Sequence, residues 1–160
     1  MSEQLAMRFQ AGVLSHLEPL SSQLVPVLRR LLAHPFVPQV HHLDFEVFCE
    51  GFSAGFPVRA FFMDADNCEH FVYADGKAQY PCDVDPGLLK IQRVYSREFE
   101  KEFSTEAPEL DCFTLAGQAL VPWFGRCWNE AGGARFDRGA FIGLHDDLRR
   151  YDLLRQEWTQ

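Results

Sequence analysis

The sequence has no long hydrophobic run, no nucleotide-binding fingerprint and no internal repeat. No apolar stretch approaches the roughly 20 residues that cross a bilayer. Residues 1–4 lack the basic and apolar regions with which a signal peptide begins. Neither a Walker A motif nor a glycine-rich dinucleotide motif occurs. We therefore expect a cytoplasmic protein that stays out of the membrane and needs no cofactor.

The cysteines also lack a recognisable arrangement. They are odd in number, and no two of them form a Cys-x-x-Cys pair. The five positions are Cys49, Cys68, Cys82, Cys112 and Cys127. In a reducing compartment such cysteines behave as small hydrophobic residues, so we predict that they belong to the core.

The acidic residues, by contrast, are concentrated in one third of the chain. Residues 64–111 contain twelve of the 23 carboxylates and five of the 15 basic residues, a net charge of −7. The remaining 112 residues carry a net charge of −1. Such a concentration favours a basic protein partner and disfavours nucleic acid or an anionic membrane, both of which would be repelled.

The first half of the chain changes its hydrophobic period from helical to alternating. Residues 3–33 place apolar side chains three and four positions apart, which predicts a helical segment. From residue 43 the apolar residues alternate with polar ones, and residues 56–63 are apolar on both faces. With turns at Asp66-Asn67 and Asp75-Gly76, this pattern predicts an antiparallel meander of about four strands.

The second half is predicted to contain one or two helices and a C-terminal β-hairpin. Asp85-Pro86-Gly87 has the form of a helix start, although residues 88–95 also fit a strand. Residues 113–131 fit a buried helix that contains Trp123 and Trp128 and ends at two glycines. Two short strands complete the chain, and we expect residues 1–160 to form a single α+β domain.

Ser53 lies in the only sequence that matches a catalytic motif, Gly-x-Ser-x-Gly at residues 51–55. In α/β-hydrolases this motif forms a strand-to-helix turn that exposes a nucleophilic serine, and His145 follows in the required order. Here, however, residues 56–62 read as a strand, so a hairpin loop accounts for the same residues. We therefore rank a small serine hydrolase that uses Ser53 third, after two protein-binding functions.

Three further segments are reminiscent of metal sites. His145-Asp146-Asp147 contains a His-Asp pair, but it follows an apolar strand and fits a polar turn. His41-His42 would have to aim at one ion, which adjacent strand residues cannot do. Residues 64–69 begin like a calcium loop yet lack its glycine, and they predict an acidic hairpin tip.

The closing part of the chain, together with its small size and acidity, resembles bacterial immunity proteins. The residues that carry this resemblance are Trp123-Phe124, Cys127-Trp128, Ala131-Gly132-Gly133, His145-Asp146-Asp147, Tyr151-Asp152-Leu153 and Trp158. Immunity proteins protect a cell from its own interbacterial toxin, delivered by type VI secretion or contact-dependent systems. The resemblance implies a non-catalytic inhibitor that binds a cognate toxin, often by occluding its active site.

Type III secretion chaperones are a second family that is similar in size, acidity and α+β composition. They hold an unfolded segment of an effector, whereas an immunity protein binds a folded toxin. A chaperone would hold that segment on apolar patches, whereas for an immunity protein we expect carboxylates to pair with lysine or arginine of the toxin. The candidate partner-binding residues are Asp64, Asp66, Glu69, Asp83, Asp85, Glu98, Glu102 and Glu106.

Overall fold

A computed structural model gives the arrangement of most of the chain. It describes residues 2–48, 51–70, 72–74, 77–79, 84–85, 88–89 and 91–159. Cys49, Cys82 and the predicted Asp75-Gly76 turn lie outside these residues. In the described part, no helix is both long enough and apolar enough to cross a membrane.

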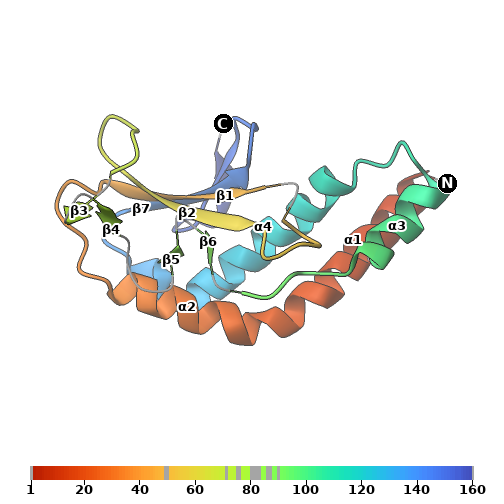
Figure 1. Ribbon diagram of the computed structural model, residues 1–160, viewed down its shortest axis with the longest axis horizontal. Helices are drawn as coiled ribbons and strands as arrows, with labels where there is room; N and C mark the ends of the chain where they lie inside the picture. The colour runs from red at the N-terminus through yellow and green to blue at the C-terminus, as the bar shows by residue number, and fades with distance from the viewer. Residues whose placement is uncertain are drawn as a thin grey trace.

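The described residues form an α+β fold, as the sequence predicted (Figure 1). The helices are α1 (Ser2–Leu17), α2 (Ser21–Ala33), α3 (Arg97–Glu106) and α4 (Cys112–Glu130), with short 3₁₀ turns at Glu18–Leu20 and Gly133–Arg135. The strands are β1 (His42–Val47), β2 (Val58–Met63), β3 (Val72–Ala74), β4 (Lys77–Gln79), β5 (Val84–Asp85), β6 (Leu88–Leu89), β7 (Gly139–Leu144), β8 (Arg150–Asp152) and β9 (Glu157–Thr159).

The main sheet is mixed, with the strand order β5-β6-β2-β1-β7-β8-β9. β1 pairs antiparallel with β2, as the meander predicted, but it pairs in parallel with β7. β3 and β4 pair with each other in a separate two-stranded sheet, so the four predicted strands do not form one continuous meander. The position beside β1 is taken by β7, whose residues Ala140 and Ile142 are fully buried. A parallel neighbour needs a long crossover, and α4 lies within that crossover.

The helix predicted to start near Asp85 begins eleven residues later. Leu88 pairs with Arg59 of β2, which agrees with the alternative strand prediction for this segment. Helix α3 starts after Ser96, whose hydroxyl accepts a hydrogen bond from the backbone N–H of Phe99. A serine cap satisfies one of the free N–H groups of the first turn and thereby fixes where the helix begins.

The predicted buried helix is confirmed as α4. Pro122 lies inside it, and the helix ends where Gly132 adopts a positive φ of 94°. Trp123 and Trp128 are buried, as predicted. Of the described cysteines only Cys127 is buried, whereas Cys112 is partly exposed and Cys68 is exposed at a loop. The core prediction is therefore wrong for Cys68.

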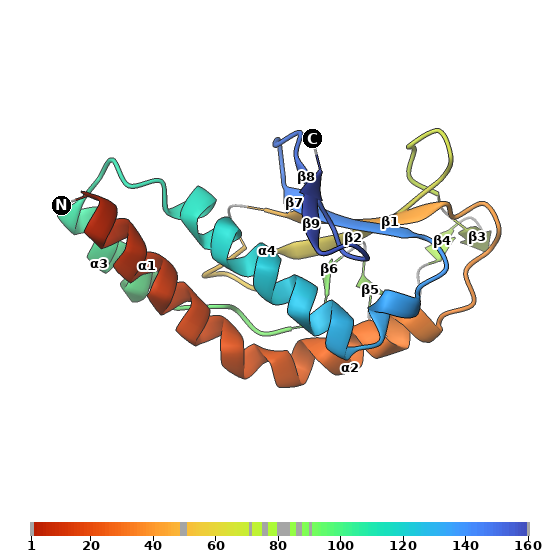
Figure 2. The ribbon, with the colours of Figure 1, turned by 180° about the vertical axis from the view of Figure 1, so that it is seen from behind.

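The described helices lie on one side of the sheet, and α4 packs against the sheet on that side (Figures 1 and 2). On β1 the buried residues are Leu43, Phe45 and Val47. The Phe45 ring lies 5.0 Å from the Phe124 ring and 5.9 Å from the Trp128 ring of α4. Because side chains alternate along a strand, the intervening residues of β1 must point to the opposite face.

We expect Trp128→Ala to lower the free energy of unfolding by about 3–5 kcal/mol, because the ring is fully buried and its loss leaves a cavity. Urea denaturation followed by circular dichroism measures this change. Trp158→Ala is the matched control, since Trp158 is 40% exposed, and we expect it to cost about 1 kcal/mol or less. Equal effects of the two changes would contradict the packing described here.

Candidate functional site

The face of the sheet opposite the helices, called the open face below, is polar at its centre. His42, Asp44 and Glu46 of β1 lie on it, alternating with the buried residues of the same strand. Two segments project beside this face: residues 64–70, called the acidic loop, and the β8–β9 hairpin (Figures 1 and 2). Between them lies a hollow of about 380 Å³, lined by residues of β1, the acidic loop and the hairpin.

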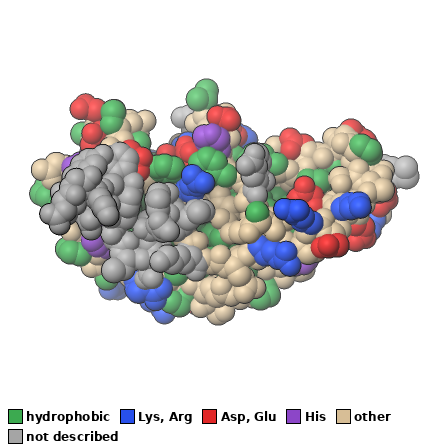
Figure 3. Space-filling view, in the orientation of Figure 1, with side chains coloured by type: hydrophobic (Ala, Val, Ile, Leu, Met, Phe, Trp, Pro, Cys, Tyr) green, Lys and Arg blue, Asp and Glu red, His purple; other side chains and the backbone are tan. Residues whose placement is uncertain are grey.

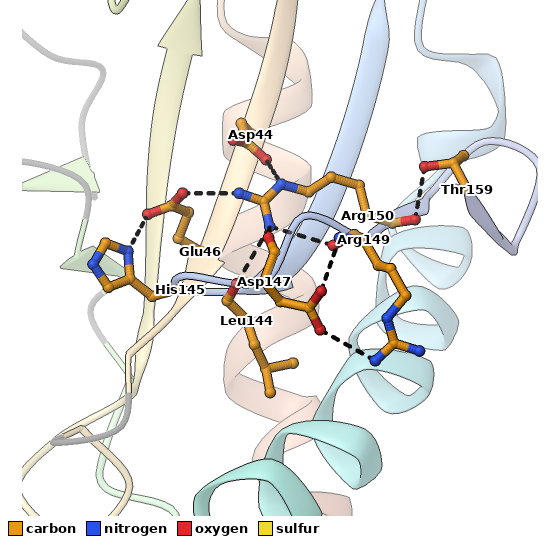
Figure 4. Close-up of polar contacts among 8 residues, drawn as sticks. All are labelled: Asp44, Glu46, Leu144, His145, Asp147, Arg149, Arg150 and Thr159. Carbon is orange, nitrogen blue, oxygen red and sulfur yellow. Dashed lines mark hydrogen bonds and ion pairs between the residues drawn. The ribbon is translucent and has the colours of Figure 1, made fainter.

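Arg150 of β8 connects the strands that form this face (Figure 4). Its Nη2 donates to Glu46 Oε1 at 2.9 Å, and its Nε lies 3.4 Å from Asp44 Oδ1. Its Nη1 donates to the carbonyl oxygens of Leu144 and Asp147 at 3.3 and 3.1 Å. One guanidinium therefore joins β1 to the end of β7 and to the turn that follows it.

Gly143 makes room for this guanidinium. A Cβ atom at residue 143 would lie 2.3 Å from Arg150 Nη1 and 2.7 Å from the carbonyl oxygen of Arg149. Both distances are shorter than any ordinary contact, so a side chain at this position would displace Arg150. The glycine in β7 is therefore a condition for the Arg150 contacts.

Asp44 is the carboxyl whose ionisation the surroundings change most. Burial raises its pKa to about 6, with Glu46 adding to the rise and Arg150 opposing it. Its Oδ1 atom is buried and accepts no hydrogen bond within the described part of the chain, since Arg150 provides only an ion pair there. The hollow thus contains a carboxylate that is incompletely satisfied.

Residues 145–149, called the Leu148 turn below, form the polar turn predicted between the last strands. Asp147 accepts from the backbone N–H and from Nη2 of Arg149, at 2.9 and 3.1 Å. The backbone hydrogen bond holds the pKa of Asp147 below its usual value. His145 Nδ1 lies 3.0 Å from Glu46 Oε2, which ties the turn to β1.

The described residues that were considered as metal ligands do not assemble into a metal site. No group of three or more His, Cys, Asp or Glu residues among those described is placed to hold a metal ion. The prediction that His41 and His42 point to opposite faces of a strand is wrong, because their Nδ1 atoms lie 3.1 Å apart. Only His42 belongs to β1, so strand alternation does not separate the two rings.

Ser53 lies in a loop, as the hairpin interpretation predicted. The loop is closed by a 2.7 Å hydrogen bond from the N–H of Gly55 to the carbonyl of Gly51. It leads into β2, which pairs antiparallel with β1. A helix does not follow the serine, so the strand-to-helix geometry of the hydrolase motif is not formed.

The acidic middle third does not form a single face. Asp64, Asp66 and Glu69 lie on the acidic loop, and Asp64 Oδ1 accepts from the backbone N–H groups of Asp66 and Cys68 at 2.9 Å each. This geometry confirms the acidic hairpin tip. Asp85 lies on β5 at an edge of the sheet, and Asp83 is outside the described residues.

The remaining candidates, Glu98, Glu102 and Glu106, lie on α3. That helix packs on α1 through Phe9, whose ring is 5.5 Å from Phe99 and 5.1 Å from Phe103. Helix α3 and the acidic loop are at opposite ends of the molecule (Figures 1 and 2). Acidic side chains accordingly appear at both ends of the surface (Figure 3).

The cluster of Asp44, Glu46 and Arg150 is not visible in the sequence, because 104 residues separate Arg150 from Glu46. The exposure of Leu148, whose side chain is 96% accessible, was not predicted either. An isolated leucine within a polar turn is the signal that could have revealed it.

No protein-family model matches the sequence, and comparison with curated proteins and with solved structures gives no match either.

We expect Arg150→Ala to lower the free energy of unfolding by about 2–3 kcal/mol, because it leaves Asp44 and Glu46 as neighbouring carboxylates without their counterion. Arg155→Ala is the matched control: its side chain is 74% exposed, and its ion pair with Asp152 spans 3.8 Å. Such a surface pair contributes less than about 1 kcal/mol. Equal unfolding midpoints in urea for the two variants would contradict this role of Arg150.

We expect Asp44→Asn to gain stability relative to the natural protein as the pH rises from about 4 to about 6. The folded state keeps the Asp44 proton up to about pH 6, whereas the ordinary pKa of an aspartate side chain is 3.8. Between these values the folded state binds more protons, so the stability that Asp44 provides at low pH is lost as the pH rises. Urea unfolding at several pH values measures the difference, which is at most about 3 kcal/mol. A difference that stays constant over this range would contradict the raised pKa.

Proposed function

We propose that this protein is an immunity-type inhibitor that binds a cognate antibacterial toxin in the cytoplasm and occludes its active site. The observation that supports this proposal is the open face: a sheet surface free of helices, with carboxylates on its floor and on the projecting acidic loop. Asp44 and Glu46, which share the guanidinium of Arg150, form the floor, and Asp64, Asp66 and Glu69 belong to the loop. A toxin with a basic surface fits this distribution of charge.

The charge of this face suits recognition of a folded protein. Exposed carboxylates on a projecting loop attract a basic partner over a distance and speed up its association. Carboxylates that are partly buried, such as Asp44 and Glu46, contribute at short range once water is excluded. An enzyme that acts on an anionic substrate carries basic residues in its active site, and these are the groups that such a face would cover.

A secretion chaperone is the second candidate. It is favoured by Met7 and Leu14, two exposed apolar residues seven positions apart on α1, which therefore lie on one side of the helix. Such a stripe could hold an extended apolar segment of an effector. The state of the bound partner distinguishes the two proposals, because an inhibitor binds a folded toxin domain. The proposal assigns no catalytic role to Ser53.

We expect reversal of the acidic loop, Asp64→Lys with Asp66→Lys and Glu69→Lys, to slow association with the partner about tenfold or more at low salt. The partner is first captured from the native organism with tagged protein at low and at high salt. Its binding is then measured with purified components by surface plasmon resonance.

The matched control is the same change of charge on α3, made as Glu98→Lys, Glu102→Lys and Glu106→Lys. Thermal melts verify that both triple variants fold. We expect the α3 variant to associate nearly as fast as the natural protein. The proposal is wrong if the partner's affinity and salt dependence are unaffected by reversal of the acidic loop.

A further inference from the structure

Leu148 is the most exposed large hydrophobic residue among those described. Its side chain is 96% exposed at the tip of the Leu148 turn. The turn separates two hollows, and Leu148 lines both of them. One is the 380 Å³ hollow of the open face, and the other, of about 470 Å³, lies toward Phe113 at the start of α4. A fully exposed leucine between two hollows offers apolar surface whose burial by a partner would be favourable.

The backbone under Leu148 is held on both sides. The N–H of Asp147 donates to the carbonyl of Leu144 at 3.0 Å, and Asp147 in turn accepts from the N–H of Arg149. Arg150 holds the carbonyl oxygens of Leu144 and Asp147. The turn is therefore ordered before any partner arrives, which lowers the entropy lost on binding.

The hollow behind Leu148 has the chemistry of a site for a basic side chain. Asp44 and Asp147 contribute two carboxylates against the one guanidinium of Arg150, and the ring of Phe141 contributes an aromatic surface that can stack on a cation. Asp44 is the incompletely satisfied carboxyl described above. The unsatisfied Oδ1 atom is itself buried against Arg150, but 17% of the Asp44 side chain is exposed, so a cation in the hollow would lie close to this carboxylate.

We propose that Leu148 and the hollow beside Asp44 together anchor the interface: the partner encloses Leu148 in an apolar depression and inserts a lysine or arginine into the hollow. The occupant is a folded protein with a basic surface, and the inference rests on the function proposed above. The acidic loop governs the rate of encounter, whereas the Leu148 anchor governs the lifetime of the complex.

The test is the dissociation rate of the purified partner, measured for Leu148→Ala and Asp44→Asn. We expect each variant to dissociate at least tenfold faster, with an association rate within about twofold of that of the natural protein. Val37→Ala is the matched control, because Val37 is also an exposed apolar residue, 37% accessible, but lies between α2 and β1. It should leave both rates unchanged. Leu148 contributes nothing to the core, so Leu148→Ala should fold normally. A change in its dissociation rate then reports on the interface and not on folding.

The inference is overturned if Leu148→Ala dissociates as slowly as the natural protein while reversal of the acidic loop still slows association. In that case the proposed function stands and the anchor lies elsewhere. If Leu148→Ala instead abolishes self-association without affecting the partner, the occupant is a second copy of this chain, and the inference is again wrong. If the natural protein binds no folded basic protein at all, the proposed function fails first.

Discussion

The ion pair and hydrogen bonds of Arg150 determine the shape of the open face. This one guanidinium reaches the carboxylates of β1 and the carbonyl oxygens at the end of β7, and Gly143 leaves the space that it needs. Without it, Asp44 and Glu46 would repel each other in a partly buried place, and the Leu148 turn would lose two of its hydrogen bonds. The floor of the hollow and the turn beside it are thus two consequences of the same contact.

The same sheet has opposite surfaces because its helices lie on one side. Phe45 packs on α4, and its neighbours Asp44 and Glu46 must then face away from the core. A polar sheet surface next to water is stable by itself. This surface also holds a projecting acidic loop, a partly buried carboxyl and an exposed leucine, and it is the surface that we propose contacts another protein.

How much the sequence revealed depended on the range of each interaction. Helix α4 and the β1–β2 hairpin were predicted well, because hydrophobic period, caps and turn residues are local signals. The parallel pairing of β7 with β1 was not predicted, because no residue near either strand indicates a partner about a hundred residues away. The start of α3 was misjudged because Ser96 caps the helix where Asp85 had been expected to do so.

For the same reason the candidate site was only partly predicted. The concentration of acidic residues was correctly located in the chain, but the fold sends the acidic loop to one end of the molecule and Glu98, Glu102 and Glu106 to the other. Hydrogen–deuterium exchange of the complex with its partner distinguishes these surfaces most directly. We expect the partner to slow exchange in residues 64–70 and 145–149 and to leave exchange in α3 unchanged. Protection confined to α3 and α1 would contradict the proposed binding surface.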